Sequence, residues 1–360
     1  MGIRIDSPQA ETWLIYSLGG GWGHLIRSLS LGRIAARNYN VKILTNSPYV
    51  AYLQDQLPEL GCQLEAIAPD TSFTRTCEQV RSLLLNSHYD CLIIDTFPRG
   101  LGGELADILP QLKHIPRILI HRDLKPEYVD KFGLRSFVAQ HFNAVIVPGD
   151  GEDLPLSDLP IVQHTHPWLI RNADELPDIT TARRMLLNKE TRGIKNSDSV
   201  KIILVCAAGK QSELPLFGVI TKHLAAAFPD AAVRCLSPIC PTGCPPDLWI
   251  SHFPGIECLR GADVVVGGAG YNTVYECAAL GIPLLAFALK RLYDRQERRI
   301  KATSYGIKDI EILIATIQSL LNQQQQGIDR HQVNYINGAV EAVGLIEQAI
   351  AKNNASIEPI

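Results

Sequence analysis

The sequence contains no long hydrophobic run. The longest candidate, Cys277 to Leu289, is interrupted by Gly281 and Pro283 and falls well short of the roughly 20 apolar residues that a membrane-spanning helix needs. The first residues, MGIRIDSPQAE, have no apolar core, so we expect no signal peptide. These absences predict a cytoplasmic protein, with at most a peripheral contact at the inner face of a membrane.

An excess of either charge is also absent. The chain has 34 Lys and Arg residues against 37 Asp and Glu residues, a net charge of −3. A general nucleic-acid binder needs a basic surface to neutralise phosphates, so the charge argues against that class. With 46% hydrophobic and 20% charged residues, the composition is that of a soluble globular protein, and 360 residues are enough for two domains.

Cysteines are present without the spacing of a metal site. Nine are scattered through the chain, most of them inside apolar runs, which indicates reduced, buried thiols. Cys240 and Cys244 are close in sequence, but their gap is not the usual two residues and no second ligand pair follows. We therefore expect no zinc centre.

Short apolar runs alternate with segments of helical periodicity, a pattern typical of a parallel sheet covered on both faces. It breaks at a polar segment, residues 171–200, and then starts again. The predicted strands are 12–17, 41–45, 63–66, 91–95, 117–121, 144–147, the run that begins at 201, 232–236, 263–266 and 283–288. The predicted helices are 26–36, 102–109, 213–227, one that starts near 273, and 332–352.

This organisation predicts two Rossmann-like, doubly wound α/β domains in series. We expect an N-terminal domain at 1–168, a linker and first helix at 169–200, a second domain at 201–330, and a C-terminal helix at 331–360 that packs back across the domains. In such sheets ligands bind outside the carboxyl ends of the strands. The expected site is therefore a cleft faced by the two sheets.

The most glycine-rich stretch, GGGWGHLIRSLSLGRIAAR, follows the first predicted strand. It does not fit a dinucleotide fingerprint, because His24 occupies the third glycine position, and it lacks the Lys-Ser/Thr ending of a triphosphate loop. What remains is a loop with little side-chain bulk before a helix that carries His24. The helix dipole favours a neutral imidazole there, which can act as a base or a hydrogen-bond partner. The alternative is a glycine turn with a surface histidine.

A second stretch, GADVVVGGAGYNTVYECAALGIPLLAF, again predicts strand, glycine loop and helix. The amides from Gly268 to Asn272 would form a phosphate-sized cradle. Glu276, about one turn into the helix, could accept hydrogen bonds from the hydroxyls of a ribose. Alternatively, Thr273 and Glu276 form a capping box, and Asn272 or Thr273 caps the helix.

A third stretch, KRLYDRQERR, follows the strand predicted at 283–288. Asp294 and Gln296 are polar groups at a strand's carboxyl end, and they are suited to contact sugar hydroxyls. The alternative is a helix start with Asp294 as its cap.

These stretches, in this order, resemble glycosyltransferases of the GT-B fold, among them family 28, typified by the enzyme that transfers N-acetylglucosamine from UDP to lipid-linked muramoyl-pentapeptide. GGGWGHLIRSLSLGRIAA resembles the family's Gly-Gly-His loop and following helix. GGAGYNTVYECAALGIPLLAFAL and YDRQ resemble its donor signature, which is Gly-x-x-Thr-x-x-Glu, then Gly-x-Pro, then Asp-x-x-Gln or Asp-x-Gln. IIDTFPRGLGGELADIL with RILIHRD is similar to a branch of predicted glycosyltransferases that share Asp-x-x-Pro-x-Gly and Arg-Asp elements.

The resemblance implies a role for each matching residue. Glu276 would hold the donor ribose, Asp294 and Gln296 would contact the donor sugar, and His24 would face the reacting carbon. The diphosphate would be surrounded by Gly268, Ala269, Gly270, Tyr271, Asn272 and Thr273. The acceptor side would comprise Gly20, Gly21, Trp22, Gly23, Arg99, His121, Arg122 and Asp123. The family's serine-bearing loop is AAGKQSE here, where Gly209 and Lys210 would meet phosphate. Asp-x-Asp is absent, so we expect no bridging metal.

The resulting hypothesis is metal-independent, inverting transfer of a sugar from a nucleotide-diphosphate sugar to a hydroxyl of a small or lipid-linked acceptor. The resemblance implies that the donor is a UDP-sugar. Either His24 or Asp95 would be the base, the latter if burial tunes its carboxyl toward neutrality. No cofactor beyond the sugar nucleotide is expected. The alternatives are a nucleotide-sugar epimerase or hydrolase, a non-catalytic binding or scaffold protein on the same fold, and, ranked lower, a Rossmann oxidoreductase.

Overall fold

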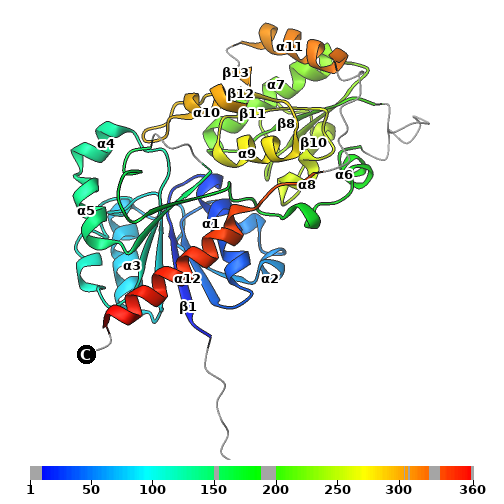
Figure 1. The fold of residues 1–360 in the computed structure, drawn as a ribbon. Helices are drawn as coiled ribbons and strands as arrows, with labels where there is room; N and C mark the ends of the chain where they lie inside the picture. Colours follow the sequence, from blue (N-terminus) through cyan, green and yellow to red (C-terminus); the bar gives the residue numbers. More distant parts are fainter. Residues whose placement is uncertain are drawn as a thin grey trace, which may run out of the picture. The chain divides into compact units, whose positions relative to one another are not determined.

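Two structural units make up the chain in the computed structural model, which describes residues 10–149, 154–187, 200–303, 305–306, 309–323 and 333–357 (Figure 1). The first unit contains residues 10–20, 24–168 and 338–357 of the described chain, and the second contains residues 21–23 and 169–337 with the same gaps. Each unit has its own parallel sheet.

The described part of the first unit has a sheet of seven parallel strands in the order β3-β2-β1-β4-β5-β6-β7. The central strands β4, β5 and β6 are buried along their whole length, and β1 is buried after its first residue, because helices cover both faces of the sheet. This burial accounts for their continuous apolar sequences. The strands are β1 (Thr12–Ser17), β2 (Asn40–Thr45), β3 (Cys62–Ala66), β4 (Cys91–Asp95), β5 (Arg117–Ile120), β6 (Ala144–Pro148) and β7 (Val162–Thr165).

Helices of the first unit connect these strands, and the last one returns from the end of the chain. In Figure 1 α12 (red) crosses in front of this sheet, and it contacts β6 and β7. Ser72 caps α3 by accepting a hydrogen bond from the Arg75 amide at 3.4 Å. The helices are α1 (Trp22–Ala35), α2 (Leu57–Leu60), α3 (Phe73–Asn86), α4 (Pro126–Lys131), α5 (Leu134–His141) and α12 (Gly338–Ile357).

The second unit repeats this plan with six described parallel strands in the order β10-β9-β8-β11-β12-β13. Phe217 and Leu224 of α7 and Leu313 of α11 belong to its apolar core. The strands are β8 (Ile202–Cys206), β9 (Ala232–Leu236), β10 (Trp249–Ile250), β11 (Val264–Gly268), β12 (Leu284–Phe287) and β13 (Tyr305–Gly306). The helices are α6 (Ile179–Leu186), α7 (Leu214–Ala227), α8 (Gly255–Leu259), α9 (Tyr271–Leu280), α10 (Gln296–Thr303) and α11 (Ile310–Gln323).

Each sheet has one point at which the direction of strand addition reverses. It lies between β1 and β4 in the first unit and between β8 and β11 in the second. Parallel α/β sheets bind ligands at such a switch point, outside the carboxyl ends of the strands. The glycine-rich stretches follow β1 and β11, so both open directly at a switch point.

The strands predicted from sequence are confirmed to within a residue or two, but the helix predicted at 102–109 is wrong. The segment forms turns, in which Gly100 and Gly103 have φ of 85° and 87°. The buried carboxylate of Glu104 accepts hydrogen bonds from the Tyr16 hydroxyl and from the amides of Leu101 (3.1 Å) and Gly102 (2.8 Å). These bonds replace the helical ones. The helix predicted at 332–352 corresponds to α12, but it begins only at Gly338 and ends at Ile357. The prediction is therefore wrong for residues 333–337, which are not helical, and residue 332 lies outside the described chain.

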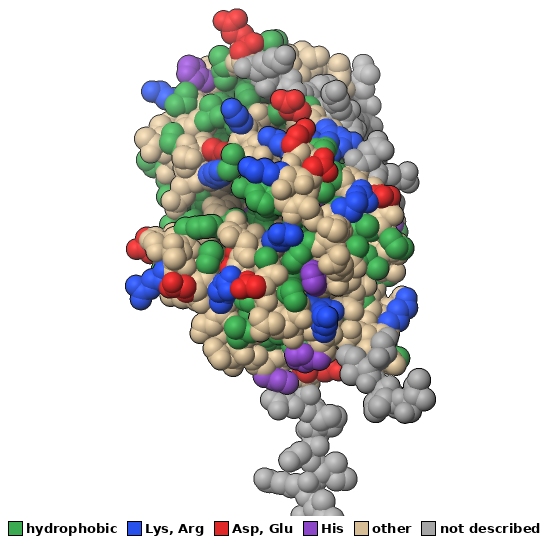
Figure 2. All heavy atoms as spheres, turned by 90° about the vertical axis from the view of Figure 1, so that its left-hand side faces the viewer, with side chains coloured by type: hydrophobic (Ala, Val, Ile, Leu, Met, Phe, Trp, Pro, Cys, Tyr) green, Lys and Arg blue, Asp and Glu red, His purple; other side chains and the backbone are tan. Residues whose placement is uncertain are grey.

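Other sequence expectations concern the surface and the thiols. Across the described residues, no helix has the length and apolar character to cross a membrane. On the face drawn in Figure 2, Lys and Arg side chains (blue) are intermixed with Asp and Glu side chains (red) rather than gathered in one basic field. All nine cysteines are free, and burial raises the pKa of Cys244 to about 12. In the described chain, no group of three or more His, Cys, Asp or Glu is placed to hold a metal ion.

Replacing Glu104 with Ala should destabilise the first unit by about 2–4 kcal/mol, because buried hydrogen-bond donors then lose their acceptor. The matched control is Asp107→Ala in the same segment, which breaks an ion pair with Arg81 whose side chains are 59% and 42% exposed. Exposed pairs contribute about 0–1 kcal/mol. Denaturant unfolding of the two variants measures the difference. Equal destabilisation would show that Glu104 does not organise this turn.

Candidate functional site

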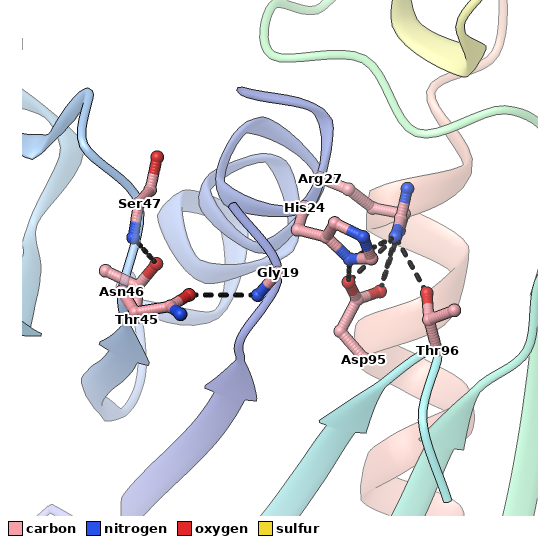
Figure 3. Close-up of polar contacts among 8 residues, drawn as sticks. All are labelled: Gly19, His24, Arg27, Thr45, Asn46, Ser47, Asp95 and Thr96. Atoms are coloured by element: carbon pink, nitrogen blue, oxygen red, sulfur yellow. Dashed lines mark hydrogen bonds and ion pairs between the residues drawn. The ribbon is translucent and has the colours of Figure 1, made fainter. Parts of the chain in front are cut away.

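In the first unit, a histidine and a buried carboxylate meet at the switch point. His24 lies in the first turn of α1, which follows β1, and Asp95 is the last residue of the neighbouring strand β4. Figure 3 shows the two side chains pointing toward each other, with His24 Nδ1 at 2.6 Å from Asp95 Oδ2. The Asp95 side chain is fully buried, whereas that of His24 is 24% exposed. The imidazole is therefore hydrogen-bonded to a buried group and is still partly exposed to solvent.

Arg27 completes this cluster from the next turn of α1. Its Nε donates to Asp95 Oδ1 and its Nη2 donates to Asp95 Oδ2, both at 2.8 Å, so the carboxylate is bound at both oxygens. The same Nη2 donates to Thr96 Oγ1 at 3.0 Å. Thr96 has a φ of 71°, which is strained for a β-branched residue. Strain of this kind is most often retained at functional sites.

Charge determines which nitrogen of His24 carries the proton. Burial alone would raise the pKa of Asp95, but the charges of Arg27 and His24 and their hydrogen bonds outweigh it and lower the pKa below its ordinary value. The expectation that burial tunes Asp95 toward neutrality is therefore wrong. An ionised carboxylate only accepts hydrogen bonds, so Nδ1 of His24 is assigned the hydrogen. Nε2 then keeps a lone pair that can take a proton.

Gly19 and its neighbours fix the position of the imidazole ring. Gly19 has a φ of 144°, and a Cβ at this position would lie 2.7 Å from His24 Cδ2, so no larger residue fits. Asn46, which follows β2, holds this backbone by accepting a hydrogen bond from the Gly19 amide at 3.0 Å (Figure 3). Phe97 stacks at 5.7 Å between ring centroids. The ring is thus confined on two sides by uncharged groups.

The rest of the glycine loop borders open space. A Cβ added at Gly20, Gly21 or Gly23 would have no described atom within 4 Å. Packing in the described chain therefore does not require glycine at these positions. Trp22 begins α1 and is half-buried.

In the second unit, the start of α9 has no side-chain cap. The N-cap is Gly270, and it makes no side-chain capping hydrogen bond in the described chain. Thr273 is the third residue of the helix, so the capping box proposed for Thr273 and Glu276, and a cap by Asn272, are wrong. A Cβ on Gly270 would meet nothing within 4 Å. The first-turn amides of α9 are therefore available to an anion.

Glu276 is a buried carboxyl without a partner among the described residues. Its residue is 8% exposed, and burial raises its pKa to about 7. The Oδ1 atom of Asn272, in the first turn of the same helix, is also buried without a hydrogen-bond partner. Buried polar groups in proteins are nearly always hydrogen-bonded, and an unpaired one requires an explanation. Hydroxyl and amide donors of a ligand would satisfy both groups.

Two ion pairs connect the loops that carry the other residues predicted to bind the sugar nucleotide. Glu213 binds Arg291 and accepts the Lys210 amide at 3.1 Å, and a Cβ on Gly209 (φ 134°) would lie 2.5 Å from its Oε2 atom. These contacts join the loops after β8 and β12.

The second pair joins the loops after β11 and β12. Asp294 pairs with Arg299, which also donates to the Ala269 carbonyl at 3.1 Å. Gln296 is buried, and its Oε1 accepts the Leu289 amide at 3.0 Å. Its amide oxygen is therefore used inside the protein.

The two units together match solved structures of one fold. The chain is similar to the glycotransferase of kitacinnamycin, with 17% identity, coverage of 95% of this chain and 100% of that chain, and a TM-score of 0.56. It is similar to the spinosyn rhamnosyltransferase SpnG complexed with thymidine diphosphate, with 16% identity, coverage of 95% and 96%, and a TM-score of 0.54. The UDP-GlcNAc 2-epimerase from Neisseria meningitidis bound to UDP-GlcNAc matches at 13% identity, 95% and 100% coverage, and a TM-score of 0.56.

The chain has the GT-B fold. No protein-family model matches the sequence, and no curated protein is significantly similar to it. Because the identities are this low, the match establishes the GT-B fold and leaves the chemistry to be argued from the site.

The remaining predicted residues of this GT-B chain include four in the loops after β4 and β5. Arg99 packs over the Phe137 ring at 4.6 Å, in the loop after β4. His121, Arg122 and Asp123 directly follow β5 and are buried.

Sequence reasoning missed Arg27, Asn46, Glu213, Arg291 and Arg299. A signal was available for Arg27, because it lies three residues after His24 and so on the same face of α1.

Replacing Glu276 with Gln should stabilise the GT-B chain at alkaline pH. In the folded protein the carboxyl ionises near pH 7, whereas in the unfolded chain it ionises near pH 4.3. Ionisation therefore penalises the wild-type fold increasingly from about pH 4 to pH 7 and constantly above, by about 4 kcal/mol as an upper estimate. The Gln variant escapes this penalty, so its advantage should be largest at pH 8 and vanish near pH 4.

Unfolding free energies measured across this pH range test the expectation. Glu297→Gln, at an exposed position of α10, is the control and should change stability by less than about 0.5 kcal/mol at every pH. A Glu276→Gln variant that is no more stable than wild type at pH 8 would mean that the carboxylate has a partner in solution.

Proposed function

We propose that this protein is a glycosyltransferase that moves a sugar from a nucleoside-diphosphate sugar to a hydroxyl acceptor. The observation that carries the proposal is the His24–Asp95 pair at the switch point, whose geometry leaves Nε2 ready to accept a proton. Solved neighbours include glycosyltransferases and a UDP-GlcNAc 2-epimerase. The sequence resemblance favours UDP as the nucleotide. The acceptor would be a small or lipid-linked molecule, and a cytoplasmic location stays a prediction.

The donor would be held by the second unit. The amides at the start of α9, from Gly268 to Thr273, would bind the diphosphate, and Glu276 would accept hydrogen bonds from the ribose hydroxyls. A bound ribose would supply the donors that Glu276 lacks. Because a carboxylate accepts two hydroxyls only when ionised, donor affinity should rise with pH through about 7, the pKa of Glu276.

The chemical step would invert the anomeric carbon. The acceptor oxygen forms a bond to that carbon while the bond to the diphosphate oxygen breaks, and the acceptor proton passes to His24 Nε2. Asp95 stabilises the imidazolium and keeps its orientation, as a buried carboxylate does in other His-dependent sites. The positive end of α9 stabilises the charge on the leaving diphosphate. The mechanism therefore requires no metal ion.

Three other functions use parts of the same arrangement. A hydrolase would direct the His24 base at water, and an epimerase would need the donor alone. A binding or scaffold protein would need only the cradle of the second unit, and it leaves the positioned His24–Asp95 pair without a purpose. The first two differ from a transferase in a measurable way, since they consume donor when no acceptor is present.

A thermal-shift panel with UDP, GDP, dTDP, ADP, NAD and NADP should identify the nucleotide. At pH 8 and 100 times its Kd, a ligand stabilises the fold by about 2.7 kcal/mol, which raises the unfolding midpoint by a few degrees. We expect one nucleoside diphosphate to shift wild type and the Glu297→Gln control, and not Glu276→Gln.

Two outcomes of the panel would count against the proposal. A shift by NAD or NADP would indicate an oxidoreductase. No shift with any compound would remove the support for a donor site and favour a scaffold protein.

Kinetics with the nucleotide sugar should separate the two halves of the site. His24→Ala should lower kcat by about 10²–10⁴-fold, because a general base contributes that much, with little change in donor KM. Glu276→Gln should mainly raise donor KM. His88→Ala, which changes a side chain that is 86% exposed, is the control and should behave as wild type.

Two results would overturn these roles. Wild-type transfer by His24→Ala would remove His24 as the base. Donor consumption in the absence of acceptor, at the full rate, would replace the transferase with a hydrolase or epimerase.

A further inference from the structure

Asp95 receives more positive charge than a carboxylate that only orients a histidine. Three N–H donors converge on its two oxygens, one from His24 at 2.6 Å and two from Arg27 at 2.8 Å. The Arg27 side chain is 4% exposed and that of Asp95 is 0% exposed. Both charges are thus removed from water, where their mutual attraction is strong and salt screens it little.

The combined charge of Asp95 and Arg27 determines how favourable a protonated His24 would be. Asp95 and Arg27 together are neutral, so an imidazolium beside them would leave one uncompensated positive charge. Moreover, Arg27 Nη2 lies 3.4 Å from His24 Nδ1, and the hydrogen assigned to Nδ1 for its bond with Asp95 prevents Nδ1 from accepting one from Arg27. This contact is repulsive and becomes more so when the ring is charged. Arg27 therefore opposes protonation of His24, whereas Asp95 alone would favour it.

The other groups around the ring do not change this balance. The segments against His24 are α1, which carries Arg27, β4, which ends in Asp95, and the loops that contain Gly19 and Phe97. Gly19 and Phe97 have no charge. Asp95 and Arg27 are the charged groups whose contacts with the His24 ring are described.

We propose that Arg27 is a positioning residue that neutralises Asp95 and thereby sets the pH range in which His24 can accept a proton. The inference rests on the proposed function of His24 as a base and adds to it the group that adjusts this base. The guanidinium group of Arg27 also donates hydrogen bonds to both Asp95 and Thr96, so it fixes the plane of the carboxylate to which His24 donates. With Arg27 in place, the charge of Asp95 is already compensated, so a proton on the imidazole gains less attraction than it would beside an unpaired carboxylate.

The test is an NMR titration of the histidine ring signals, which needs neither substrate nor activity. The His24 signal is assigned by its loss in His24→Asn. In Arg27→Gln, which keeps polar donors near Asp95 but removes the charge, the titration midpoint of His24 should rise by about one pH unit or more, a tenfold gain in proton affinity. In Arg27→Lys, which keeps the charge, the midpoint should stay near that of wild type.

A charge-matched control excludes a general electrostatic effect. Arg37→Gln removes a positive charge from an exposed position just after α1 and should leave the His24 midpoint unchanged. An unchanged midpoint in a folded Arg27→Gln variant would overturn the proposal. An equal rise in Arg27→Gln and Arg27→Lys would also overturn it, because geometry rather than charge would then be responsible.

A second measurement applies if Arg27→Gln does not fold. Removing one partner of a buried ion pair leaves the other charge uncompensated. The double variant Arg27→Gln, Asp95→Asn lacks that charge, so it should recover folding that the single variant lost. If the double variant is no more stable than the single one, Arg27 does not neutralise Asp95.

The titration also separates this inference from the proposed function. If a donor binds and transfer is observed but the midpoint does not move, the role of Arg27 fails and the transferase stands. If no donor binds and the midpoint moves as expected, Arg27 controls the protonation of His24 in a site of another function.

Discussion

A carboxylate that is fully buried has to be compensated, and the architecture around Asp95 follows from that requirement. The fold places this residue at the carboxyl end of a central strand, out of contact with water. Arg27 and His24, both on α1, supply the compensating charge and hydrogen bonds. Since α1 must present both side chains to Asp95, its rotation is fixed, and Gly19 is forced to remain without a Cβ against the imidazole. The catalytic candidate is thus positioned as a by-product of neutralising a buried charge.

The buried carboxyl of the second unit, Glu276, lacks among the described residues the compensating partners that Asp95 has. Glu276 follows β11, the strand equivalent to β4 in the order of its sheet, but no cation or donor in the described chain reaches it. The nearby arginines are engaged elsewhere, Arg291 by Glu213 and Arg299 by Asp294. One switch point is therefore complete by itself, as suits a group that performs chemistry. The carboxyl at the other switch point has no hydrogen-bond donor in the described chain, as suits a group that would bind the hydroxyls of a ligand.

The comparison with solved structures agrees with a scaffold that tolerates great sequence change. Identities between 13% and 17% accompany coverage of nearly the whole chain. In a parallel α/β sheet the strands need only continuous apolar side chains, and many sequences meet that requirement. Chemistry depends on a few residues in the loops at the carboxyl ends, which can change while the sheet stays.

The sequence by itself located the buried central strands along the chain, because they are short apolar runs, and it located the glycine loops and the candidate residues His24, Asp95 and Glu276. It did not indicate the strands β7, β10 and β13. It did not determine the turn at residues 102–109, where apolar periodicity resembles a helix and only the folded Glu104 carboxylate shows otherwise. It left open whether Thr273 and Glu276 form a cap, since the spacing fits and the actual helix start does not. Nor could it reveal that Arg27 binds Asp95, a residue 68 positions away. That contact exists because β1 and β4 are neighbours in the sheet, and only the tertiary structure decides which strands are neighbours.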